Sequence, residues 1–240
     1  MLLVSIIVPA LEEENWIAET ISQFKPLSIP HEVIVSDGGS QDKTVEVARA
    51  LSHQVYVMTK GEPCAARQRN DGAKRAMGEY LAFVDCGVTV PNCDAFFKLA
   101  ISHFENDAEL VATVGPLAIN SEIATLADKL FLGCENFVIW LQNNVLNRGA
   151  GTGKFMFIRR AAFERIGGFR EKLVAGEDLD LVLRLSRIGK TRFVRDLLVR
   201  YAGRREHQIG WIGLMWIWTI NVWWIWLFDR ANAKTWTPIC

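Results

Sequence analysis

The chain has 240 residues, half of them hydrophobic, and its 27 basic and 27 acidic side chains give a formal net charge of zero. This length is enough to bury the core of one large domain, and the lack of a basic excess argues against a nucleic-acid-binding protein. Five cysteines without a CxxC pair indicate neither a zinc knuckle nor a disulfide framework, and they fit a reducing compartment. No basic region precedes the first apolar run, so no signal peptide is predicted.

The first half of the chain alternates between strand and helix patterns. Short β-rich apolar runs predict strands over residues 4–8, 32–36, 55–58 and 80–84. Helical patterns separate them, over residues 12–24, 42–51 and 63–77. The first helix opens with three glutamates, which suit a helix N-terminus. This alternation is typical of a parallel, doubly wound α/β sheet. Neither GxGxxG nor a GxxxxGK loop follows the first strand, which disfavours an ordinary dinucleotide-binding domain and a P-loop.

The second half of the chain is less regular. Helices are predicted over residues 93–104, 124–146, 161–166 and from 177 to about 187, and strands over 110–114 and 155–158. A glycine-rich break over 149–153 separates the long apolar helix from the last of these strands.

The segment 209–228 carries no charge and holds six of the nine tryptophans. Its length would allow it to span a bilayer, and the basic residues before it would then keep the main domain on the cytoplasmic side. Tryptophan prefers the membrane interface, and Thr219 and Asn221 lie in the middle of the segment. A helix lying on the membrane surface is therefore favoured. The segment could instead pack on its own domain or pair with a second subunit in a homodimer.

Two aspartates stand at the ends of predicted strands. Asp37 and Asp85 would lie along one edge of a parallel sheet, where open α/β sheets bind ligands. Acids there hold a ribose, a base or a divalent cation that rides on phosphates, although Asp85 could instead cap a turn. Arg67, Arg69 and Asn70 lie on the helix between them, where an arginine either clamps a phosphate or faces solvent.

A second acidic pair, Glu177 and Asp178, begins a helix after Gly176. A helix N-terminus keeps a carboxylate ionised, and an ionised carboxylate facing a cleft can act as a general base. The alternative is that Asp178 and Asp180 only complement the helix dipole.

Taken in order, these motifs make the chain similar to a known family. They are Pro9-Ala10-Leu11-Glu12-Glu13-Glu14, Val35–Asp42, Arg69–Gly72, Gly78–Asp85, Gly167-Gly168-Phe169 and Glu177-Asp178. From Val4 to about Gly189 the chain resembles the family 2 glycosyltransferases, nucleotide-sugar-dependent enzymes of the GT-A fold. The resemblance implies an α/β fold with a Rossmann-like, mostly parallel central sheet flanked by helices. We expect this domain over residues 1–205, followed by a Trp-rich, membrane-associating hydrophobic helix over 206–240.

The resemblance also implies roles for single residues. Asp178 is the expected catalytic base, and the Gly151–Gly153 loop would let the backbone approach donor or acceptor. Asp85 and His207 are the expected ligands of Mg²⁺ or Mn²⁺. Donor binding is expected of Pro9, Glu13, Asp37, Gly38, Arg67, Asn70, Asp85, Gly153, Glu177 and Arg204.

The sequence departs from the family pattern at the metal motif. The family usually has Asp-x-Asp there, whereas this chain has Asp85-Cys86-Gly87, and Glu12 replaces the usual asparagine of the opening motif. Metal-independent transfer, with Arg204 or Arg205 neutralising the diphosphate, is therefore the alternative to a divalent cation. No clear QxxRW motif of processive synthases is present, so we expect one sugar per encounter.

These features predict an inverting transfer of sugar from a nucleotide-sugar donor to an acceptor hydroxyl or phosphate, at the cytoplasmic face of a membrane. The apolar C-terminal segment suggests a lipid-linked acceptor in cell-envelope glycan synthesis. Two rival functions are a nucleotidyltransferase, which the residues after the first strand disfavour, and a non-catalytic sugar-binding or scaffold subunit. The Asp85-Cys86-Gly87 departure supports a scaffold, and the intact Glu177-Asp178 pair argues against it.

Overall fold

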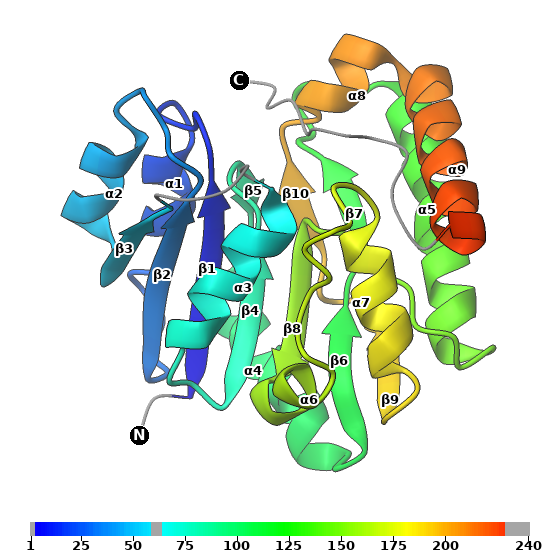
Figure 1. Cartoon of the computed structure of the whole chain (residues 1–240), viewed down its shortest axis with the longest axis horizontal. Coiled ribbons are helices and arrows are strands. Elements are labelled where there is room, and N and C mark those ends of the chain that lie inside the picture. The colour runs from blue at the N-terminus through cyan, green and yellow to red at the C-terminus, as the bar shows by residue number, and fades with distance from the viewer. Residues whose placement is uncertain (1–2, 59–63, 229–240) are drawn as a thin grey trace.

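A seven-stranded central sheet forms the frame of the computed structural model, which describes residues 3–58 and 64–228, except the side chains of 222, 223 and 225–228. Its strand order is β3 (Gln54–Val57), β2 (His31–Asp37), β1 (Val4–Ala10), β4 (Tyr80–Val84), β8 (Phe155–Arg159), β6 (Leu110–Val114) and β9 (Lys190–Phe193). The first four strands are parallel, and β8 runs antiparallel to both β4 and β6. The predicted mostly parallel α/β sheet is confirmed (Figure 1).

Helices cover both faces of this sheet because successive side chains of its strands point in opposite directions. One core packs strand residues such as Ile6 and Phe157 against α1 (Ile17–Ser22), α2 (Thr44–Leu51) and α4 (Cys93–Asn106). The other packs residues such as Ile7 and Phe83 against α3 (Ala65–Arg75), α6 (Arg160–Arg165) and α7 (Glu177–Leu185). Most side chains of the central strands are apolar on both faces, which is typical of a buried parallel sheet.

A small second sheet joins β5 (Val88–Thr89), β10 (Val199–Tyr201) and β7 (Leu117–Ile119). Neither these strands nor β9 can be predicted from the sequence pattern. They have two to four residues each, which is too short for a period-two pattern to show. The small sheet brings the chain after β4 next to the chain before α8 (Arg204–Ile209).

Two predicted boundaries near the N-terminus are wrong. Strand β1 does not stop at Pro9 but continues to Ala10, because its pairing with β4 ends at Ile7 and the proline needs no hydrogen-bond donor on that side. The first helix begins at Ile17 rather than at the glutamates. Glu12 has a left-handed φ of 55°, and the backbone N–H groups of Glu12 and Glu13 donate to side chains of the 40–44 loop.

The apolar C-terminal segment forms α9 (Trp211–Phe228), which lies beside α5 (Leu126–Asn144) in Figure 1. The Trp211 ring stacks on Phe131 at 5.2 Å, and its Nε1 donates to Asp128 at 2.6 Å. None of the helices in the described ranges has both the length and the apolar character required to cross a membrane. Residues 229–240 of the predicted segment lie outside the described residues, and the division at 205/206 stays a prediction.

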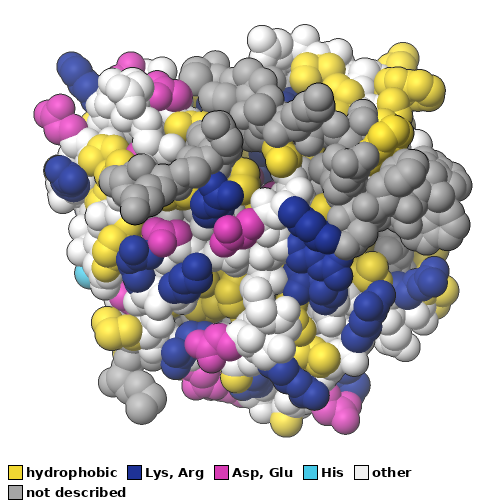
Figure 2. Space-filling view, in the orientation of Figure 1, with side chains coloured by type: hydrophobic (Ala, Val, Ile, Leu, Met, Phe, Trp, Pro, Cys, Tyr) yellow, Lys and Arg dark blue, Asp and Glu magenta, His cyan; other side chains and the backbone are white. Residues whose placement is uncertain are grey.

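Part of α9 faces outward. Ile212 is 84% exposed and Trp216 is 69% exposed, and hydrophobic side chains gather over the α8–α9 corner (Figure 2, upper right). On the neighbouring helix α5, Leu126 and Leu130 are also exposed. We call these four side chains the α5–α9 apolar face.

Candidate active site

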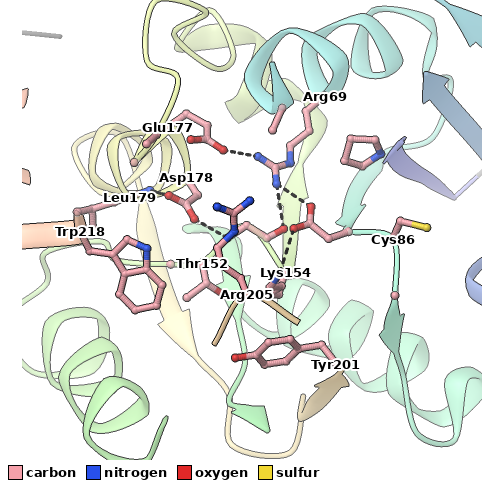
Figure 3. A pocket seen from close by; sticks show the side chains of 18 of the residues that line it. Arg69, Cys86, Thr152, Lys154, Glu177, Asp178, Leu179, Tyr201, Arg205 and Trp218 are labelled. Carbon is pink, nitrogen blue, oxygen red and sulfur yellow. Dashed lines mark hydrogen bonds and ion pairs between the residues drawn. The ribbon is translucent and has the colours of Figure 1, made fainter. Parts of the chain in front are cut away.

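A cavity of about 460 Å³ lies at the carboxyl ends of β1 and β4. Residues of α3, the 150–154 loop, α7, α5, α8 and α9 contribute to its walls. Its position agrees with the expectation that an open α/β sheet binds ligands at this edge. The structure therefore places side chains from distant parts of the chain around one space (Figure 3).

Arg69 lies at the centre of the charged wall of this cavity. Its side chain is only 2% exposed, and its Nη1 donates to Glu177 at 2.7 Å. Its Nη2 donates to Asp85 at 2.7 Å and to the carbonyl oxygen of Gly153 at 3.3 Å. Burial lowers the pKa of Arg69, but the charges of Asp85 and Glu177 outweigh it and raise the pKa further. Arg69 is therefore a fixed cation that holds three separate segments together (Figure 3).

The acidic pair stands at the N-terminus of α7, which begins after Gly176 in a left-handed conformation with φ 75°. Asp178 accepts hydrogen bonds from the backbone N–H of Gly153 at 2.5 Å and of Leu179 at 2.8 Å. Burial raises the pKa of Asp178, and Arg69 opposes this. Burial and the charge of Asp178 also raise the pKa of Glu177. Both carboxylates therefore hold a proton more tightly than an exposed acid does.

Asp85 follows β4 and has two basic neighbours. Its Oδ1 accepts from Arg69, and its Oδ2 lies 3.9 Å from the Nζ of Lys154. Cys86 points away from these charges (Figure 3), and its Sγ lies 3.7 Å from the Oγ1 of Thr20. Burial raises the pKa of the Cys86 thiol, so it stays neutral. A Cβ on Gly87 would lie 3.4 Å from the Nη2 of Arg204.

Arg204 closes the wall on the side of β1. Its Nη2 lies 2.9 Å from both carboxylate oxygens of Glu13, and its guanidinium lies 5.2 Å from the centroid of the Trp16 ring. Burial raises the pKa of Glu13, and the hydrogen bond and charge of Arg204 oppose this.

Seven of the predicted site residues line the cavity together: Pro9, Glu13, Asp85, Gly153, Glu177, Asp178 and Arg204. These residues lie between positions 9 and 204, so the fold brings distant parts of the chain together around this cavity. Their individual roles stay predictions.

The rest of the predicted site residues are not among the described residues that line the cavity. Asp37 is buried and accepts hydrogen bonds from the backbone of Gly39 and Ser40 at 2.8 and 2.9 Å, so it orders its own loop. The N–H of Gly38 donates to Ala10. Asn70 exchanges hydrogen bonds of 2.9 Å with the backbone of Phe169. The helix that carries Asn70 is predicted to start at Pro63, and Pro63 lies outside the described residues.

Arg67 and His207 point to partners other than the cavity. Arg67 pairs with Glu171 at 3.3 Å. His207 does not approach Asp85, because its Nε2 lies 3.0 Å from the Oδ2 of Asp128 on α5. The expectation that His207 and Asp85 share a metal ion therefore finds no support in the geometry.

Several lining residues were not identified from the sequence. Lys154 directly follows the Gly151–Gly153 loop, which is predicted to approach donor or acceptor. This adjacency is the one sequence feature that points to Lys154. Glu135 on α5 lines the cavity as well, and burial, followed by the charges of Asp178 and Glu206, raises its pKa to about 7. Trp218 of α9 completes the wall. The hydrophobic patterns of α5 and α9 do not distinguish Glu135 and Trp218 from their neighbours in the sequence.

Comparison with known proteins supplies the family. The family model described as glycosyl transferase family 2 matches residues 5–167. Succinoglycan biosynthesis protein ExoA of Rhizobium meliloti (strain 1021) is 26% identical over 200 residues, which are 80% of this chain and 60% of that protein. The O-antigen chain rhamnosyltransferase WbaN of Salmonella anatum is 26% identical over 197 residues, 77% of this chain and 62% of that protein. The chain thus spans about six-tenths of the length of these relatives.

A solved structure with the same fold is the mannosyltransferase PcManGT from Pyrobaculum calidifontis in complex with GDP-Man and Mn²⁺. It aligns with a TM-score of 0.71 at 18% identity, covering 87% of this chain and 59% of that one. At this identity the likeness concerns the GT-A fold. Since the family model covers well over half of the sequence, the chain belongs to glycosyl transferase family 2.

Proposed function

We propose that this protein is an inverting glycosyltransferase that moves a sugar from a nucleotide-sugar donor to an acceptor hydroxyl or phosphate. The observation that carries the proposal is Asp178, a partly buried carboxylate held by two backbone N–H groups in a cavity with basic side chains. A base and a site for a departing anion are the two elements that such a transfer requires.

Asp178 acts as the general base in this mechanism. It takes the proton of the acceptor hydroxyl as the acceptor oxygen forms a bond to the anomeric carbon of the donor sugar. The bond between that carbon and the diphosphate oxygen breaks, and its electron pair leaves with the nucleoside diphosphate. Attack opposite the leaving group inverts the anomeric centre. The hydrogen bonds from Gly153 and Leu179 fix the orientation of the carboxylate, and its raised pKa makes it a better proton acceptor near neutral pH.

The donor side of the cavity is proposed on the wall of Pro9, Glu13, Asp85 and Arg204. The likeness to a structure that holds GDP-Man supports a nucleotide sugar as the donor class. Four predicted donor-binding residues are proposed to act indirectly, by ordering the loops beside this wall, because their polar groups bond to protein neighbours: Asp37, Gly38, Arg67 and Asn70.

A Mg²⁺ or Mn²⁺ ion is predicted at Asp85, and the mannosyltransferase of the same fold was solved in complex with Mn²⁺. The residues of this chain do not fit such an ion. One oxygen of Asp85 already accepts from Arg69, and the other faces an ammonium group. Within residues 3–58 and 64–228, no three His, Cys, Asp or Glu side chains come together as a metal-binding group. The proposed mechanism therefore has no step through a metal ion.

The acceptor is proposed to be lipid-linked and to reach the site from the cytoplasmic face of a membrane. Helix α9 supports this proposal because it contributes Ile217 and Trp218 to the cavity, while the adjacent Trp216 and Ile212 are exposed on the α5–α9 apolar face. One helix thus connects an apolar surface with the site. The names of the relatives, which concern succinoglycan and O-antigen, support a role in cell-envelope glycans.

A screen of nucleotide sugars tests the proposal. The full chain is incubated with each donor and with polyprenyl-phosphate vesicles, and release of nucleoside diphosphate is measured with EDTA and with Mn²⁺. Release with at least one donor, and a product of inverted anomeric configuration, is the expected result. Binding of a donor without release under either condition would instead support the scaffold alternative, and a product of retained configuration would contradict the inverting mechanism.

A further inference from the structure

Lys154 lies in the wall of the cavity beside Asp85. Its Nζ lies 3.9 Å from the Oδ2 of Asp85 and 5.0 Å from the centroid of the Tyr201 ring. The side chain lines the cavity and is 34% exposed (Figure 3). Among the described residues, no acceptor lies within hydrogen-bonding distance of this ammonium group. Its three donors therefore remain available to a ligand in the cavity.

The neighbouring guanidinium groups are arranged differently. Arg69 uses its donors on Glu177, Asp85 and Gly153, and it is almost completely buried. Arg204 holds both oxygens of Glu13. These two arginines are committed to protein carboxylates, whereas Lys154 makes only a long ion pair with an acid that already has a partner.

The carboxylate of Asp85 is engaged differently from a ligand in a divalent-cation site. Such a site collects several carboxylate or carbonyl oxygens around the ion. Here the single carboxylate of Asp85 faces two cations, Arg69 and Lys154. At Gly87, two residues further on, no carboxylate is present, and a side chain there would approach Arg204. A divalent cation at Asp85 would have to displace one of these two cations, whereas the Lys154 ammonium can donate directly to a diphosphate oxygen.

We propose that Lys154 binds the diphosphate of the nucleotide-sugar donor in place of a divalent cation, so that donor binding and transfer require no metal. This inference rests on the proposed glycosyltransferase function. As the bond between the anomeric carbon and the diphosphate oxygen breaks, the negative charge on that oxygen increases. The Lys154 ammonium stabilises this charge by hydrogen bonding and charge attraction.

Nucleotide binding provides a test that does not depend on turnover. UDP and GDP, and the nucleosides uridine and guanosine, are titrated into the protein by calorimetry, once in EDTA and once with Mn²⁺. We expect at least one diphosphate to bind without metal and Lys154→Met to weaken it roughly tenfold or more, with little change for its nucleoside. Lys98→Met, which removes an exposed lysine on α4, should bind as wild type does. Lys154→Arg keeps the charge and should stay within a few fold of wild type.

Three results would overturn the inference. They are diphosphate binding that requires Mn²⁺, equal binding by Lys154→Met and wild type, and no binding of UDP or GDP under either condition. A thermal unfolding curve for each variant excludes loss of fold as the cause. Turnover separates this inference from the proposed function. Transfer that needs Mn²⁺ refutes the role of Lys154 alone, whereas metal-free diphosphate binding that depends on Lys154, without transfer, refutes the proposed function alone.

Discussion

Arg69 and Glu177 are 108 positions apart in the sequence, yet their side chains form a 2.7 Å ion pair that is almost sealed from solvent. The same guanidinium holds Asp85. Burying charges is costly unless they are paired and hydrogen-bonded. Two acids of the candidate active site are therefore positioned by a buried cation from another element, and its removal should affect both folding and function.

Arg69→Met should lower the free energy of unfolding by about 3–5 kcal/mol, because Glu177 and Asp85 lose their buried partner. The measurement is urea denaturation at pH 7. Arg160→Met is the matched control, since its pair with Glu164 is a surface pair within one helix turn and should change stability by less than about 0.5 kcal/mol. Equal effects of the two substitutions would contradict the role of Arg69.

Asp178→Asn should reduce turnover roughly 10²- to 10⁴-fold, because the acceptor hydroxyl loses its base. Nucleotide binding should remain close to that of wild type. In wild type, turnover should fall as the pH drops through the pKa of Asp178, and burial places this decline at higher pH than for an exposed aspartate. The control Asp196→Asn changes an exposed acid and should leave turnover unchanged. Undiminished turnover by Asp178→Asn removes the base assignment.

Gly153→Ala should destabilise the site, because the new Cβ would lie 2.6 Å from the Nη2 of Arg69 and 3.4 Å from the Oδ2 of Asp178. We expect a cost of about 1–3 kcal/mol together with reduced turnover. Gly133→Ala is the contrasting variant, since no atom lies within 4 Å of its Cβ and Gly133 lies inside α5. It should raise stability by about 0.5–1 kcal/mol. Thermal unfolding of both variants makes the comparison.

Glu135 should give the protein a pH-dependent stability. Because burial raises its pKa from 4.5 to about 7, the folded state binds this proton more tightly than the unfolded state. The free energy of unfolding should therefore fall as pH rises from about 4.5 to about 7. Glu135→Gln should reduce this slope and be more stable than wild type at pH 8. Glu177 and Asp178 act in the same direction, so part of the slope remains. Identical slopes for the variant and wild type would refute this prediction.

The double variant Ile212→Ser/Trp216→Ser should bind lipid vesicles more weakly, because it removes apolar area from the α5–α9 apolar face. Co-sedimentation with vesicles that contain phosphatidylglycerol measures this. Met77→Ser, an exposed apolar residue in the connection between α3 and β4, is the control and should bind as wild type does. If wild type fails to sediment with vesicles, the proposed membrane location is wrong.

Most of the fold could be predicted because its strands and helices are long enough to carry a period. The four parallel strands β1 to β4 and the helices between them follow from alternating patterns alone. The start of the first helix is misplaced in the prediction because the glutamates look like a helix N-terminus. Their backbone is instead bound by Ser40 and Thr44, which come from another loop.

Three properties can be predicted without coordinates: the family, the alternation of the first four strands with helices, and the presence of Asp85 and Asp178 at the ends of such elements. Those properties depend on local patterns and on motif order. The folded chain is needed to see that His207 pairs with Asp128, that Arg69 joins Asp85 to Glu177, and that Lys154 faces Asp85. The physical reason is that the partner of a buried charge is set by how helices and strands pack, and sequence spacing carries no information about that packing.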